Sequence, residues 1–97
     1  MNCIEIIQLR APGVAEANQA KTMINRMHTS RSRQCVYDSD IPRAWKIFKS
    51  PLYQTDISLH LYWEKESCPS KPSIFGLRIA KALEYYGLIS HSIWQET

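Results

Sequence analysis

Three side chains in the sequence have the chemistry of a polar site: the carboxylate of Glu5 and the imidazoles of His60 and His91. Two imidazoles and a carboxylate can bind a divalent metal ion. Alternatively, one imidazole can act as a general base that the carboxylate orients. The three residues are far apart in the chain, so either chemistry requires the fold to bring them to one surface.

Each of the three lies in a segment with the pattern of a β-strand. Residues 3–9 contain the carboxylate and are otherwise almost entirely apolar, which is typical of a strand buried on both faces. In residues 56–64, apolar and polar side chains alternate, which predicts one face on a core and one more polar face that carries His60. Residues 88–96, which include His91, are rich in isoleucine, serine and tryptophan and predict a final strand.

Two helices are predicted between these strands. The first follows the Pro12-Gly13 break, ends near Thr29 and has an apolar stripe with steps of three and four: Val14, Ala17, Ala20, Ile24 and Met27. The stripe of the second consists of Phe75, Ile79, Ala82, Leu83 and Tyr86. Ser70 or Ser73 is the expected N-cap of this second helix, and Gly87 is expected in a left-handed conformation after its end.

The segment between the first helix and residue 56 has the weakest pattern. Residues 30–42 are polar, although residues 35–37 fit a short strand. Residues 44–48 fit either a helical turn or a strand buried on both faces. Because Pro51 and a polar stretch separate them from the next strand, we favour a strand that forms a hairpin with a longer loop.

The order strand, helix, strand, strand, helix, strand predicts one α+β domain over residues 1–97 with the ferredoxin-like βαββαβ arrangement. Its four-stranded antiparallel sheet should carry both helices on one face, because crossovers are right-handed. We expect the other face to carry three residues of the first strand (Glu5, Ile7 and Leu9) with His60 and Tyr62. This face is too apolar to be simply solvated, and a second copy of the chain is its expected cover.

Composition excludes several classes of protein. Twelve Lys and Arg against nine Asp and Glu give a formal net charge of +3, which is too small to indicate a nucleic-acid partner, and the strand motif of RNA-binding sheets is missing. The sequence has no apolar run long enough for a membrane span and no secretory signal pattern. We therefore expect a cytoplasmic protein.

The basic residues and the cysteines both have ordinary interpretations. Residues 21–49 hold seven Lys and Arg against two Asp, which we interpret as a solvated helix end and loop rather than as an anion site. Cys3, Cys35 and Cys68 lack the spacing of a zinc site and are odd in number. We interpret them as reduced thiols, and we expect neither a disulfide framework nor a cofactor.

The C-terminal part of the sequence resembles a known family. The segments that carry the resemblance are Thr55–Trp63 on a strand, Gly76–Ala80 in a helix, and Gly87–Trp94 across the helix end and last strand. They are similar to the small ferredoxin-like proteins of the dimeric α+β barrel superfamily, related to antibiotic biosynthesis monooxygenases. The resemblance implies two sheets paired into a barrel, with ligand pockets between sheet and helices.

The resemblance covers several activities and assigns no catalytic residue. Some members of the superfamily are cofactor-free oxygenases, some degrade haem, and many small members have no known activity. The haem-degrading branch typically has a histidine on the second helix, and residues 73–86 contain none. This departure argues against haem chemistry.

The sequence favours a homodimeric α+β barrel protein that binds a small apolar or aromatic ligand between sheet and helices. The alternatives are a non-catalytic structural or interaction protein that uses the sheet face for self-association, and a cofactor-free monooxygenase. The candidate ligand-binding residues are Glu5, His60, Tyr62, His91 and Trp94. We assign no metal, because the simplest role of the carboxylate and the two histidines is hydrogen bonding in a dimer interface.

Overall fold

A computed structural model describes residues 3–31 and 42–97, and it has the predicted order of elements. The strands and helices are β1 (Cys3–Arg10), α1 (Val14–Arg31), β2 (Ala44–Lys49), β3 (Asp56–Trp63), α2 (Ile74–Leu83) and β4 (Leu88–Gln95). Short 3₁₀ turns, Lys65–Ser67 and Glu84–Tyr86, precede and follow α2. The ambiguous segment 44–48 therefore belongs to a strand, whereas the short strand considered at residues 35–37 lies outside the described residues.

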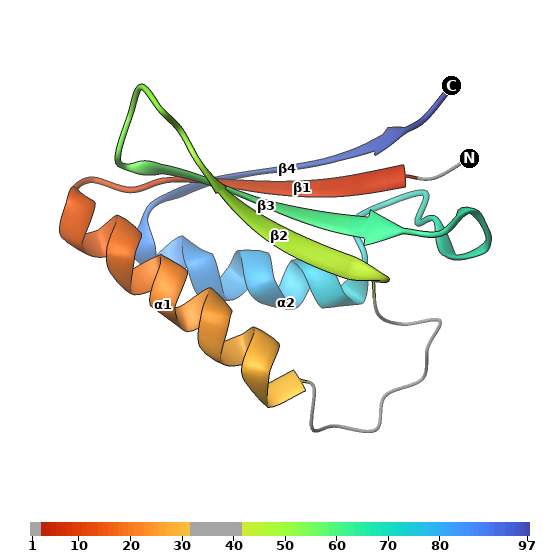
Figure 1. The fold of residues 1–97 in the computed structure, drawn as a ribbon, viewed down its shortest axis with the longest axis horizontal. Helices are drawn as coiled ribbons and strands as arrows, with labels where there is room; N and C mark the ends of the chain where they lie inside the picture. Colours follow the sequence, from red (N-terminus) through yellow and green to blue (C-terminus); the bar gives the residue numbers. More distant parts are fainter. Residues whose placement is uncertain (1–2, 32–41) are drawn as a thin grey trace.

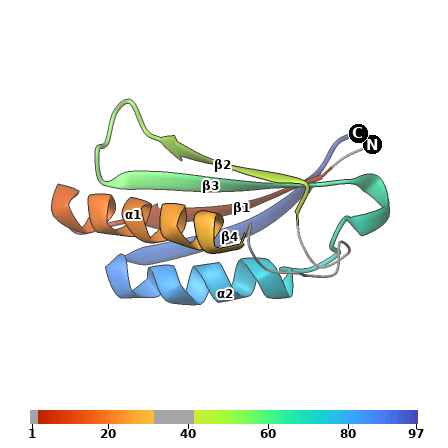
Figure 2. The ribbon, with the colours of Figure 1, turned by 60° about the horizontal axis from the view of Figure 1, so that its bottom comes forward.

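The four strands form one antiparallel sheet in the order β2-β3-β1-β4. Both helices pack on the same face of this sheet, as Figures 1 and 2 show. The ferredoxin-like arrangement predicted from the sequence is confirmed, with β1 in the interior of the sheet. Neither α1 nor α2 covers the opposite face, which is called the uncovered face below.

The side chains of β1 point the opposite way from the prediction. Ile7 is paired with Leu59, and Ile6 is paired with His60. Paired residues on neighbouring strands share a face, so Glu5, Ile7 and Leu9 lie under the helices, and Ile4 and Ile6 lie on the uncovered face with His60 and Tyr62. The prediction was wrong because β1 is apolar at both parities, and its pattern therefore does not say which parity faces the helices.

The core fills the space between the sheet and the helices. Small side chains on α1, Ala17 and Ala20, are almost fully buried and let this helix approach the sheet closely. Trp45 of β2 meets Phe75 of α2 edge to face, with 5.3 Å between ring centroids, a favourable aromatic geometry. The other large buried residues are Ile7, Leu9, Ile24, Ile57, Leu59, Leu61, Trp63, Ile79 and Leu83.

The two ends of α2 differ in how far they follow the prediction. Ser73 is the N-cap, and its Oγ accepts a hydrogen bond of 2.8 Å from the Gly76 N–H. At the other end the helix tightens into the 3₁₀ turn, and Gly87 is extended rather than left-handed, with φ at 160°. A glycine is still required at position 87, because a Cβ there would collide with the backbone of Arg10 and Ala11.

A disulfide joins Cys3 on β1 to Cys68 in the connection between β3 and α2. The interpretation of these two cysteines as reduced thiols is therefore wrong, and Cys35 lies outside the described residues. Cross-linking residues 65 positions apart stabilises the fold by about 4 kcal/mol in the chain-entropy model. Disulfides mostly persist in oxidising compartments. The cytoplasmic location expected from the sequence stays a prediction.

None of the described helices combines the length and apolar character needed to cross a lipid bilayer.

The observed parity of β1 predicts opposite outcomes for aspartate at adjacent positions. Ile7→Asp places a carboxylate without a partner in the core, where Ile7 is fully buried, and should abolish cooperative folding. Ile6→Asp places the same group on the uncovered face and should leave the fold intact. Urea denaturation followed by circular dichroism measures both. Equal unfolding midpoints for the two variants would contradict the assigned register.

Candidate functional site

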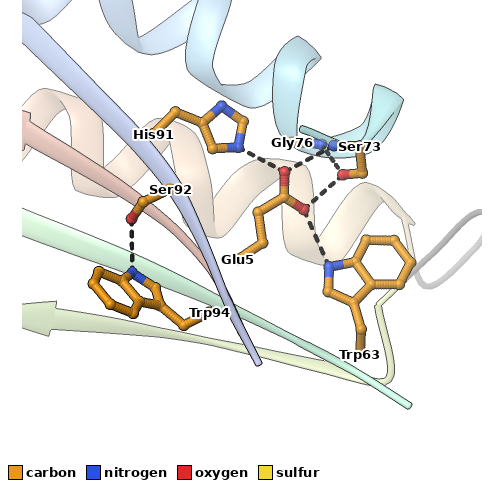
Figure 3. A network of polar contacts seen from close by, with 7 residues as sticks. All are labelled: Glu5, Trp63, Ser73, Gly76, His91, Ser92 and Trp94. Atoms are coloured by element: carbon orange, nitrogen blue, oxygen red, sulfur yellow. Dashed lines mark hydrogen bonds and ion pairs between the residues drawn. The ribbon is translucent and has the colours of Figure 1, made fainter. Parts of the chain in front are cut away.

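The fully buried carboxylate of Glu5 forms the main polar cluster of the described fold (Figure 3). Its Oε1 accepts hydrogen bonds from the Trp63 indole N–H at 3.1 Å and from the Ser73 hydroxyl at 2.7 Å. Its Oε2 accepts from the Ser73 backbone N–H at 3.0 Å and lies 2.6 Å from Nε2 of His91. The carboxylate thus makes four polar contacts with three residues, which come from β3, β4 and the start of α2.

The position of Glu5 at the first turn of α2 adds a favourable electrostatic interaction. Backbone N–H groups at a helix N-terminus carry partial positive charge and stabilise a nearby carboxylate. Ser73 links the helix to the carboxylate, because its Oγ caps α2 and its backbone N–H and hydroxyl both donate to Glu5. These contacts offset the desolvation cost of a buried charge, which is large for an unpaired carboxylate.

Gly76 makes room for the carboxylate under the helix. A Cβ at this position would overlap the oxygen and carbon atoms of the Glu5 carboxylate. The backbone of α2 therefore passes directly over Glu5, and any side chain at position 76 would push the helix or the carboxylate away. The pairing of a buried acid with a helical glycine was not apparent from either residue alone.

The contact between Glu5 and His91 orients an imidazole. An ionised carboxylate only accepts hydrogen bonds, so the 2.6 Å contact assigns the shared proton to Nε2 of His91 and leaves Nδ1 outside this contact. The His91 side chain is 12% exposed. A carboxylate that fixes the tautomer of a histidine is the arrangement of an oriented base. This pair can supply such a base to a molecule that reaches Nδ1.

The other three predicted site residues lie on the opposite side of the sheet. His60 shares a 2.8 Å hydrogen bond with Ser58, and its ring centroid lies 6.4 Å from that of Tyr62. Trp94 is 63% exposed, and its indole N–H donates to Ser92 at 3.0 Å. The prediction that Glu5 shares a face with His60 is therefore wrong, and His91, whose face the sequence left open, lies with Glu5.

The separation also divides the three side chains that the sequence offered as possible metal ligands, for which we assigned no metal. Of the three, only Glu5 and His91 are in contact. The Glu5 carboxylate also accepts hydrogen bonds from Trp63 and Ser73, and one imidazole with one such carboxylate does not make a metal site. In the part of the chain that the structure describes, no group of three His, Cys, Asp or Glu side chains is placed to hold a metal ion.

Several hollows lie on the described surface, and sequence reasoning found in full neither of the two that lie against the sheet beside α1 and on the uncovered face. The first, of about 270 Å³, lies between α1 and the sheet. It is lined by Lys21, Ile24, Asn25, Trp45, Ile47 and Leu59. The apolar stripe of α1 pointed to Ile24, whereas the contribution of β2 depended on the register of an ambiguous segment.

The second hollow, of about 590 Å³, lies on the uncovered face. It occupies the end of the sheet where β3 and β4 begin, and His60 contributes to its wall. Burial disfavours the charged imidazole and lowers the pKa of His60 below its ordinary value of 6.5. His60 is therefore a neutral hydrogen-bonding group near pH 7.

Comparison with solved structures finds this fold in proteins of very different sequence. SnoaB, a cofactor-independent oxygenase from Streptomyces nogalater solved as a mutant, superposes with a TM-score of 0.64 at 11% identity, covering 98% of this chain and 92% of that chain. Rv0793 from Mycobacterium tuberculosis gives a TM-score of 0.64 at 10% identity, covering 100% and 96%. No protein-family model matches the sequence, and no curated protein matches it.

These likenesses confirm the resemblance drawn from the sequence at the level of the fold. The chain has the α+β fold of these two proteins over nearly its full length. Identities of 10–11% show the fold alone and carry no catalytic residue to this chain, because one fold hosts many functions.

The packing of Glu5 against α2 predicts an unusual result for a helix glycine. Gly76→Ala should stabilise an exposed helix by about 1 kcal/mol from helix propensity. Here the added Cβ displaces the carboxylate from its donors, so we expect the free energy of unfolding to fall instead. Urea denaturation measures the sign, and a stabilised Gly76→Ala variant would show that Glu5 does not lie under the helix.

The lowered pKa of His60 predicts a specific loss of stability in acid. The unfolded chain takes up a proton at His60 near pH 6.5, and the folded chain does so only at lower pH. Wild type should therefore lose stability relative to His60→Gln as the pH falls below 6.5, with the difference levelling off below the pKa of the folded state. Urea denaturation between pH 5 and 8 measures it; a pH-independent difference would contradict the burial of His60.

Proposed function

We propose that this protein is a homodimer that binds a small aromatic ligand in the hollow between α1 and the sheet. The observation that carries the proposal is the mixed character of this hollow. Ile24, Ile47 and Leu59 give it an apolar wall, Trp45 offers an aromatic surface, and two polar side chains stand on α1. Ligand sites commonly combine a mostly apolar lining with a few polar groups.

The size and lining of the hollow define the class of ligand. A volume of about 270 Å³ suits one or two fused rings, since an apolar cavity of about 150 Å³ holds a benzene molecule. Lys21 and Asn25 lie on α1 one helical turn apart and can meet one oxygen substituent of the ring. A phenol such as 2-naphthol has this combination of a flat apolar body and a single polar group.

The homodimer is supported by the apolar side chains on the uncovered face. Ile4, Ile6 and Tyr62 lie there on neighbouring strands, and Trp94 beside Ile4 is 63% exposed. Contiguous apolar surface of this kind usually marks an interaction site. Self-association is the simplest way to bury it, because a two-fold dimer needs only this one surface.

The fold likeness gives the proposal a precedent and leaves one alternative. SnoaB, which has this fold, is a cofactor-independent oxygenase, so the fold can carry a small-molecule site. The alternative is an interaction protein whose uncovered face serves only self-association. The two differ in whether the hollow between α1 and the sheet accepts a ligand.

The test is titration calorimetry with 2-naphthol on wild type and two tryptophan variants. Ile47→Trp fills the hollow and should abolish binding, whereas Leu77→Trp, on the exposed side of α2, should bind as wild type does. Sedimentation equilibrium of wild type should show a dimer. A dimer that fails to bind 2-naphthol would favour the interaction protein, equal binding by all three proteins would place the site elsewhere, and a monomer at all concentrations would overturn the homodimer.

A further inference from the structure

The hollow between α1 and the sheet changes from an apolar floor to a charged rim. Ile24 and Leu59 form the floor, and each of these residues is only 1% exposed. Trp45 and Ile47 are partly buried and form the wall on β2. Lys21 lies at the rim, because it lines the hollow and is itself exposed. A ligand that fills this space therefore enters with its apolar part first and leaves its polar part beside Lys21.

The charge at this rim is positive. Lys21 makes no ion pair with any residue that the structure describes. The ion pairs of the described residues engage the carboxylates of Glu5, Asp56 and Glu64, and none of these lines the hollow. An anion at the rim thus meets a cation whose charge no described carboxylate offsets.

Lys49 adds a second cation on the helix side of the sheet. It is paired with Ile57, which is paired in turn with Leu9 under the helices. Lys49 follows Ile47 on the same face of β2, about 7 Å further along the strand. It makes no ion pair with a described residue either. Lys49 does not line the hollow, but charges at this separation still interact in physiological salt, so it strengthens the attraction of an anion.

The exposed position of Lys21 limits the cost of binding a charged group. Desolvation is most costly for an ion that loses all of its water, and a carboxylate at the rim keeps part of its own. The lysine stem can lie along apolar surface while its ammonium group stays in water. Lys21 can therefore meet a carboxylate at the rim without leaving water.

We infer that the ligand of this hollow is an ionised aromatic carboxylic acid, with its rings on the floor and its carboxylate at Lys21. The inference rests on the small-molecule site proposed above and adds the charge of the ligand, whereas it does not depend on the homodimer. A carboxylic acid is ionised at pH 7 and a phenol is not. Because a charge-assisted hydrogen bond is stronger than a neutral one, 2-naphthoate should bind about 10-fold more tightly than 2-naphthol.

The test is titration calorimetry with 2-naphthoate and 2-naphthol at pH 7 on wild type, Lys21→Met and Lys81→Met. Lys21→Met removes the charge and keeps an unbranched side chain at an exposed position, so the fold should stay intact. Lys81→Met is the matched control, because Lys81 is exposed in the last turn of α2 and does not line the hollow.

The ratio of the two affinities is the quantity that decides, because a variant that weakens the site as a whole lowers both affinities together. Wild type and Lys81→Met should both prefer 2-naphthoate by about 10-fold. Lys21→Met should bind the two compounds about equally well. Ile47→Trp, which fills the hollow, should bind neither.

The outcomes separate failure of this inference from failure of the proposed site. Wild type that binds 2-naphthol at least as tightly as 2-naphthoate would overturn the inference and leave the site standing. A preference for 2-naphthoate that survives in Lys21→Met, or that Lys81→Met loses equally, would remove Lys21 as the group that holds the carboxylate. Binding of 2-naphthoate by Ile47→Trp would place the acid elsewhere. Wild type that binds neither compound would remove the proposed site, and the inference with it.

Discussion

The buried carboxylate of Glu5 is the constraint on which the arrangement of sheet and second helix depends. A carboxylate in the core is tolerated only where donors surround it, and here the donors come from β3, β4 and the start of α2. The requirement fixes the height of α2 over the sheet, since Gly76 must lie directly above the acid. It also fixes the parity of β1, because Glu5 can reach Ser73 and Trp63 only from the helix side.

The parity of β1 then divides the polar chemistry of the molecule. Placing Glu5 under the helices brings it to His91 and keeps it from His60. The helix side thus holds an oriented imidazole and a small hollow against α1, and the uncovered face holds a neutral histidine, several serines and exposed aromatic rings. The uncovered face is the part of the molecule that the proposed homodimer buries.

The fold could be predicted from the sequence where the pattern of a segment is compatible with only one type of element and one orientation of its side chains. Strict alternation in residues 56–63 places Leu59 and Trp63 on the core side, and Ser73 is one of the two serines expected to cap α2. The orientation of β1 could not be predicted, because apolar residues occupy both parities and the decisive contacts of Glu5 join residues up to 86 positions apart. The Cys3–Cys68 disulfide is a similar long-range contact, which spacing alone does not reveal.

A double-mutant cycle between Glu5 and His91 tests this account most directly. The free energies of unfolding of wild type, Glu5→Gln, His91→Gln and the double variant give the interaction energy of the pair without the other contacts of either residue. A carboxylate and an imidazole joined at 2.6 Å in the core should show a favourable coupling of about 1–3 kcal/mol. Additive effects of the two substitutions would contradict a buried pair that holds β1, β4 and α2 together.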